Sequence, residues 1–276
     1  MRWVIASIAA LSAVAGACLL PEVNDFAGSS LDAAAESFVA PEAAAPDSAV
    51  TPEAGADAKV VCPDTSFCDD FDDGPLGAKW TSKDELDGKL TLETGGLSAP
   101  NRLLMSLTPL TGFVRRAGLT KTFAVTANPK RITCSVMVRV EGRANPPDGD
   151  TQLLEIWEHG SKDDDVYLKI GQADTYLRED SLTADGSVTA HNKTIPAGAG
   201  AIANGVWTRV VLDVDFVGKA AALTLTPNAS VPTTGSIPIT PGVGITKFDV
   251  ILAEPDDHDD GPAKASFDDL RCDFTL

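Results

Sequence analysis

The chain has 276 residues, of which 43% are hydrophobic, and its formal net charge is −18. Recognition of nucleic-acid phosphates needs clustered basic side chains, whereas this chain has 22 Lys and Arg against 40 Asp and Glu. The composition therefore excludes a nucleic-acid partner, and the acidic charge mainly favours solubility.

Residues 1–17 have the three parts of a secretory signal: Arg2 as a positive start, an apolar run over 4–14, and small residues at 15–17. The apolar run is shorter than the ~20 residues that a membrane-spanning helix needs. Cys18 follows directly, and this junction resembles the lipobox of bacterial lipoproteins, in which the cysteine is lipidated and becomes the N-terminus. Ordinary signal cleavage at the same small residues is the alternative, because a lipobox usually has Leu where this chain has Ala15.

Lipidation at Cys18 predicts an exported protein that is anchored at the outer membrane or cell surface. Leu19, rather than Asp, follows the cysteine and favours the outer membrane under the sorting rule of enteric lipoproteins. If Cys18 is not lipidated, we expect a secreted protein instead. The membrane is thus a predicted partner through the lipid, and nothing in the sequence specifies an oligomeric state.

Residues 18–61 are built largely from Ala, Pro, Glu, Asp and Ser, and Lys59 is their one basic residue. Such a segment has too little apolar surface to fold, and its prolines and like charges keep it extended. It is predicted to be a disordered linker. The composition changes at Cys62, so residues 62–276 are predicted to form one domain with its own core.

This domain shows short apolar or alternating segments between Gly and Pro residues, and no sustained helical periodicity. Strands are expected at 66–72, 89–93, 103–107, 114–125, 131–141, 151–158, 166–170, 175–178, 187–193, 206–216, 221–226, 247–253 and 265–274. The pattern predicts an all-β fold, a two-sheet antiparallel β-sandwich of jelly-roll type.

The four remaining cysteines form an even set that can make two disulfides in an oxidising compartment. Cys134 and Cys272 each lie on the apolar face of their predicted strand, so they can join within the core. Cys68 lies on the opposite face from its phenylalanine neighbours, six residues after Cys62. We therefore expect the pairs Cys62–Cys68 and Cys134–Cys272.

Three motifs occur in a fixed order: FCDDFD at 67–72 followed by Trp80, GVWTRVVLDV at 205–214, and FDDLRC at 267–272. In that order they resemble the concanavalin A-like lectin/glucanase superfamily, particularly its laminin-G-like members. The resemblance covers roughly residues 66–276. It implies a jelly roll whose concave sheet often binds saccharide, with calcium at the rim in some members. Because the superfamily includes enzymes and non-enzymes, the fold does not define the function.

Two enzymatic functions are alternatives to binding. A retaining glycosidase needs two carboxylates about 5–5.5 Å apart, but Glu155 and Glu158 face opposite sides of a regular strand. A polysaccharide lyase needs cations and a proton-transfer group, for which Tyr167, Lys169, His159 and the Arg115–Arg116 pair are available. A solvated amphipathic strand explains these residues better than a lyase site does, so the sequence favours a binding protein over an enzyme.

Saccharide rings stack on aromatic side chains while charged groups bind their hydroxyls. Six residues on the predicted solvent-facing sides of strands combine these two features: Glu155, Trp157, Tyr167, Lys169, Tyr176 and Arg178. For Trp157 a core position is the alternative, and Trp80 and Trp207 are predicted to be structural. The sequence thus predicts a non-catalytic domain that binds a polysaccharide or other glycan or mediates envelope adhesion. The alternative is a structural envelope protein without a glycan ligand.

No cofactor is specified by the sequence, but structural calcium is weighed at two places, since calcium takes six to eight oxygen ligands. One is the acidic loop with Asp256, Asp257 and Asp259, for which a solvated turn is the alternative. The other pairs Asp70 near the first strand with Asp269 in the last.

Overall fold

The computed structural model describes residues 62–63, 66–98, 100–108, 116–142, 151–170, 174–182, 187–195, 202–228, 230–253 and 263–276. The chain divides into two units, Met1–Thr51 and Pro52–Leu276, and every described residue belongs to the second. Within these ranges no helix is long and apolar enough to cross a bilayer. The leader, Cys18 and the predicted linker lie outside the described residues.

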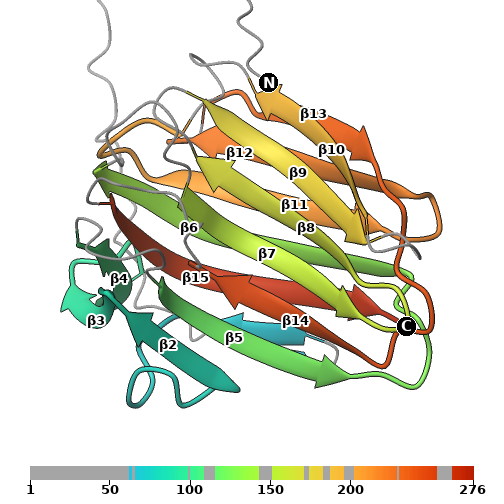
Figure 1. Cartoon of the computed structure of the whole chain (residues 1–276). Helices are drawn as coiled ribbons and strands as arrows, with labels where there is room; N and C mark the ends of the chain where they lie inside the picture. The colour runs from blue at the N-terminus through green and yellow to red at the C-terminus, as the bar shows by residue number, and fades with distance from the viewer. Residues whose placement is uncertain are drawn as a thin grey trace, which may run out of the picture. The chain divides into compact units, whose positions relative to one another are not determined.

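The strands pair into two antiparallel sheets that lie face to face, with sheet B in front of sheet A in Figure 1. In spatial order, sheet A consists of β13 (Thr233–Pro238), β12 (Ala220–Pro227), β11 (Thr208–Asp215), β6 (Arg131–Gly142), β15 (Ala263–Thr275), β4 (Asn101–Leu107) and β3 (Gly88–Thr94), with β1 (Ser66–Asp69) also paired to β15. Sheet B consists of β10 (Val188–Ile195), β9 (Thr175–Leu182), β8 (Asp164–Ile170), β7 (Thr151–His159), β14 (Lys247–Leu252), β5 (Arg116–Ala124) and β2 (Ser82–Leu86). The predicted antiparallel sandwich of jelly-roll type is confirmed.

Alternating burial along the strands places the core between the two sheets. In β6, every second residue from Ile132 to Val140 is buried, and the residues between them are only partly so. Sheet B contributes fully buried side chains such as Leu154 and Phe248 to the same core. Side chains along a strand alternate between the two faces of the sheet. In sheet B, the residues between the inward-facing ones therefore point outward, away from the core.

Two strands absent from the sequence prediction, β2 and β13, are both edge strands. All five residues of β2 are exposed, and its sequence SKDEL has no apolar face. The sequence of β13, TTGSIP, contains Gly and Pro, which are rare inside central strands. Edge strands commonly carry charges, Gly or Pro because these residues discourage pairing with other chains. Because β2 and β13 are polar, they lack the alternating hydrophobic pattern that predicts a strand.

Both expected disulfides are present, Cys62–Cys68 and Cys134–Cys272. Cys134 on β6 lies directly opposite Cys272 on β15, and both are fully buried. The second bond thus joins two central strands of sheet A, as their apolar strand faces predicted.

Candidate functional site

The outward face of sheet B carries all six residues predicted to bind ligand. They occupy alternate positions on three neighbouring strands: Glu155 and Trp157 on β7, Tyr167 and Lys169 on β8, and Tyr176 and Arg178 on β9. The register pairs Glu155 with Tyr167, and Tyr167 with Arg178, so these three side chains form one row across the strands. The structure therefore gathers the predicted residues into a single patch.

Trp157 is 36% exposed, and no other aromatic side chain reaches that exposure within the described part of the chain. This position decides between the two alternatives for Trp157, because the indole lies on the outer face and not in the core. Its ring centroid is 4.3 Å from that of His159, two residues along the same face. A partly exposed indole fixed beside another ring offers a flat apolar platform at the centre of the sheet.

The other two tryptophans of the domain have different surroundings. Trp80 is buried, and its indole N–H donates a hydrogen bond of 2.7 Å to Asp69. Trp207 lies under the guanidinium of Arg139, at 5.1 Å from the ring centroid. Trp157 is thus the tryptophan of the domain that is placed to contact a ligand on sheet B.

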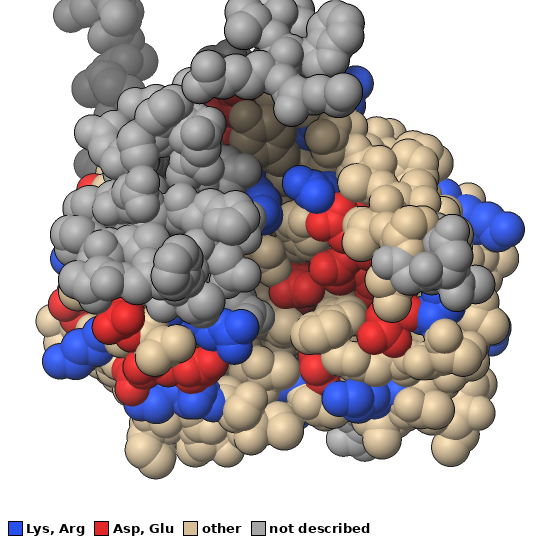
Figure 2. Space-filling view, in the orientation of Figure 1, with Lys and Arg blue, Asp and Glu red and all other residues tan. Residues whose placement is uncertain are grey.

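Two hollows open on the outer face of sheet B, and Trp157 lines both of them. The first, of about 330 Å³, is otherwise lined by Asp163, Asp164, Asp165, Asp180, Leu182 and Val188. The second, of about 290 Å³, includes Asp84, Arg116, Asp249 and Ile251 in its lining. Figure 2, which views this side of the molecule, shows acidic side chains gathered near the middle of the face, with basic ones beside them. The volume of each hollow is near the lower limit for sites that bind small molecules.

A hydrogen-bond network fixes the polar side chains next to the first hollow. The carboxylate of Asp180 accepts hydrogen bonds from the hydroxyl of Tyr167, at 2.5 Å, and from Nε of Arg178, at 2.9 Å. The ammonium group of Lys169 lies 5.3 Å from the centroid of the Tyr167 ring. Burial and the neighbouring Asp180 raise the pKa of the Tyr167 hydroxyl, which therefore stays protonated at neutral pH. These groups are held in place before any ligand arrives.

The glycosidase alternative based on Glu155 and Glu158 does not fit this geometry. Glu158 is only 2% exposed, and its carboxylate accepts a hydrogen bond of 2.8 Å from the backbone N–H of Gly242. Glu155 faces the other way and accepts a hydrogen bond from Gln152. Two carboxylates on opposite faces of one strand cannot flank the same glycosidic bond.

The residues of the lyase alternative are only partly brought together. Tyr167, Lys169 and His159 share the outer face, but the Tyr167 hydroxyl donates to Asp180, and His159 Nε2 lies 2.8 Å from Oδ2 of Asp249. Arg116 lines the second hollow, and Arg115 lies outside the described residues.

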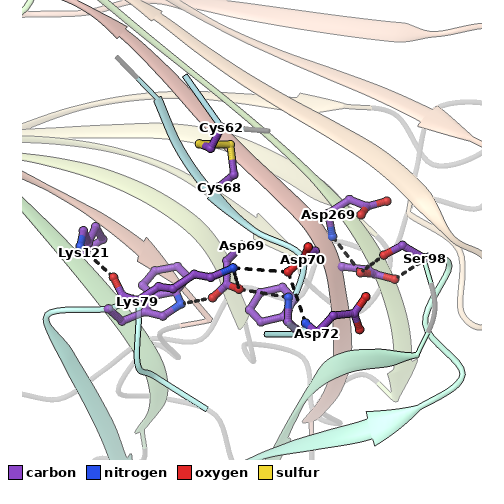
Figure 3. Close-up of polar contacts among 12 residues, drawn as sticks. Cys62, Cys68, Asp69, Asp70, Asp72, Lys79, Ser98, Lys121 and Asp269 are labelled. Atoms are coloured by element: carbon purple, nitrogen blue, oxygen red, sulfur yellow. Dashed lines mark hydrogen bonds and ion pairs between the residues drawn. A yellow bond between two sulfur atoms is a disulfide. The ribbon is translucent and has the colours of Figure 1, made fainter. Parts of the chain in front are cut away.

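The residues predicted to bind calcium are not assembled into a site in the described part of the chain. Asp70 accepts hydrogen bonds from the backbone N–H of Asp72, at 3.3 Å, and from the ammonium group of Lys79, at 3.4 Å. The Asp269 side chain points away from Asp70 (Figure 3). Among the described residues no group of three or more His, Cys, Asp or Glu side chains could hold a metal ion. The acidic loop with Asp256, Asp257 and Asp259 lies outside the described residues.

Three carboxylates of this face were not among the predicted site residues: Asp165, Asp180 and Asp249. Asp165 lies two residues before Tyr167, and Asp180 lies two residues after Arg178, so strand alternation could have identified both. The expected strands began at 166 and ended at 178, one or two residues short of these positions. Asp249 has the same alternation within β14 and would have been found by asking which face of that strand is polar.

No protein-family model matches the sequence, and no curated protein is similar to it. An alginate lyase from Klebsiella pneumoniae has 10% identity and a TM-score of 0.47, over 67% of this chain and 84% of that one. A Lotus tetragonolobus seed lectin has 12% identity and a TM-score of 0.45, over 71% and 96%. The lectin UEA-II complexed with galactose has 10% identity and a TM-score of 0.43, over 77% and 99%. All three TM-scores lie below 0.5, and similarities this low assign neither family nor activity to this chain.

Proposed function

We propose that this chain is an exported, membrane-tethered protein whose outer face of sheet B binds saccharide without modifying it. The observation that carries the proposal is the exposed indole of Trp157, which forms a wall of both hollows. Saccharide rings present apolar C–H faces that stack on aromatic rings, so an extended glycan can cross the sheet over Trp157. The hollows on either side then take the flanking sugar units.

Polar groups around the indole support the same function. Carboxylate, guanidinium and hydroxyl groups lie within the two hollows or next to them, and these are the groups that hydrogen-bond sugar hydroxyls. Asp180 is held by Tyr167 and Arg178, so this part of the surface loses little conformational freedom on binding. A binding role needs no further chemistry from the site.

Substitution of Trp157 by Ala tests this proposal. Loss of the stacked ring is expected to weaken glycan binding by about 2 kcal/mol, or roughly 30-fold, because one aromatic platform is removed. Isothermal titration calorimetry of the purified protein measures the dissociation constant for oligosaccharides that are neutral, N-acetylated, amine-bearing or uronate-bearing. Trp207→Ala, the same change just before β11 of sheet A, is the control and should bind like the wild type.

Two outcomes would contradict the proposal. If no saccharide in the panel binds the wild-type protein, the alternative of a structural envelope protein without a glycan ligand is favoured. If Trp157→Ala binds as tightly as the wild type, the binding face lies elsewhere.

The tether rests on the signal-like leader and on Cys18, which is left over when the other four cysteines form two disulfides. Cys18→Ser should move the protein from the membrane fraction to the soluble fraction after export, because the lipid acceptor is lost. Immunoblots of the two fractions measure this. An unchanged distribution of the Cys18→Ser protein would count against lipidation.

A further inference from the structure

The strand register places Trp157 between two carboxylates on the outer face of sheet B. Asp249 on β14 lies directly opposite Trp157 on one side, and Asp165 on β8 lies opposite it on the other. Asp180 on β9 comes next in the same row, opposite Asp165. Neighbouring strands are about 4.8 Å apart, so both carboxylates lie within reach of a sugar ring stacked on the indole.

The two carboxylates beside Trp157 have acceptor capacity that the described protein does not use. Asp249 is 6% exposed, and its Oδ2 lies 2.8 Å from Nε2 of His159, whereas its Oδ1 has no hydrogen-bond partner among the described residues. Oδ1 of Asp165 also has no hydrogen-bond partner among the described residues. Buried carboxylate oxygens without a donor are costly, so a donor supplied by a ligand would be bound favourably.

The first hollow selects for positive charge. Its described lining contains four aspartates, one of which, Asp164, is buried toward the inner side of the sheet, and no Lys or Arg. Burial raises the pKa of Asp165 to about 7, and repulsion from Asp180 adds to this effect, while the nearby Arg178 lowers the pKa. A cation beside Asp165 would relieve this repulsion, and a cation over the Trp157 ring gains a further cation–π attraction.

We propose that the ligand is a saccharide with protonated amino groups, such as a polymer of unacetylated hexosamine. One ring stacks on Trp157, and ammonium groups bind Asp165 on one side and Asp249 on the other. An ammonium group offers three hydrogen-bond donors and no acceptor, which suits carboxylates that lack donors. A uronate polymer would instead bring its own carboxylates against this row. This inference rests on the proposed function and names the class of its ligand.

Titration with matched oligosaccharides tests the inference. Glucosamine oligomers and their N-acetylated counterparts have the same backbone and differ in the charged amine. At pH 7, where Asp165 is about half ionised, the wild-type protein should bind the amine form at least 10-fold more tightly, because hydrogen bonds between charged groups are stronger than those between neutral groups. Asp165→Asn should remove most of this preference, and Asp249→Asn should reduce it. The control is Asp273→Asn, because Asp273 is an acidic residue on β15 of sheet A that pairs with Arg271. This variant should keep the preference unchanged.

The outcomes separate this inference from the proposed function. Equal or weaker binding of the amine form, with loss of all binding in Trp157→Ala, would overturn the inference and leave saccharide binding intact. Preference for a uronate oligosaccharide would also overturn it. Absence of binding to every saccharide would reject both. The comparison of the two ligands on the wild-type protein decides the inference even if a variant does not fold, and a fall in the preference with added salt would support it.

Discussion

Removal of the central disulfide by the double substitution Cys134→Ala and Cys272→Ala is expected to lower the free energy of unfolding by about 5 kcal/mol. The bond closes a segment of 138 residues, and long closed loops restrict the unfolded chain most. It joins two fully buried positions on the neighbouring strands β6 and β15. A loss of this size is a large part of the total stability of an ordinary domain.

The other disulfide provides the matched control. Cys62→Ala with Cys68→Ala opens a segment of only six residues, so the expected loss is about 2 kcal/mol. Urea unfolding of the oxidised wild type and of both double variants, followed by tryptophan fluorescence, measures the difference. If the short-loop variant were destabilised as much as the long-loop variant, chain restriction would not be the main contribution of the Cys134–Cys272 bond.

Glu158→Gln is expected to make the protein less sensitive to alkaline pH. Glu158, Asp164 and Glu179 are all buried on the inner side of sheet B. Burial raises the pKa of Glu158 to about 7, although the hydrogen bond from the backbone of Gly242 lowers it in part. Burial and the nearby Glu179 and Glu158 raise the pKa of Asp164 as well. Nδ1 of His191 on β10 lies 2.5 Å from the Glu179 carboxylate.

The direction of the pH effect follows from the raised pKa of Glu158. Between pH 4.5 and 7 the folded protein keeps a proton on Glu158 that the unfolded chain has already lost. The free energy of unfolding therefore falls as the pH rises through this window, and it stays lower above pH 7. Glutamine does not ionise, and its carbonyl oxygen can still accept the N–H of Gly242. Between pH 5 and pH 8, Glu158→Gln should gain stability relative to the wild type by on the order of 3 kcal/mol.

Urea unfolding at pH 5 and pH 8 measures this gain. Glu85→Gln is the control, because the hydrogen bond from Lys83 lowers the pKa of Glu85 and its titration lies below this window. The control should therefore lose as much stability as the wild type between the two pH values. An equal loss in Glu158→Gln would mean that Glu158 ionises in the folded protein as readily as in the unfolded one.

The fold could be predicted to the level of the sandwich because burial on one face imposes a period of two on the sequence. Strands such as β6 and β11, which are central in sheet A, show this period clearly. Strand phase also identified the partners of Cys134 and Cys272. The edge strands β2 and β13 were missed because an edge needs little apolar surface and tolerates Gly, Pro and charge. The order of strands within each sheet depends on pairing between distant segments, which local patterns do not encode.

The candidate site was predictable in part for the same reason. Alternation along β7, β8 and β9 placed six residues on one face, but it could not bring Asp249 next to Trp157. That neighbour comes from β14, about 90 residues further along the chain, and its position depends on sheet topology. Local sequence therefore predicted the aromatic platform, while tertiary pairing supplied the carboxylate on its far side.

Crystals of the protein soaked with the oligosaccharide that binds best in titration would show which face of the sandwich holds the ligand. The outer face of sheet B is predicted to hold the ligand, with one sugar ring stacked on the indole of Trp157 and neighbouring units in the two hollows. A ligand bound on sheet A or at the loop ends of the sandwich, with Trp157 uncovered, would mean that the outer face of sheet B is not the binding face.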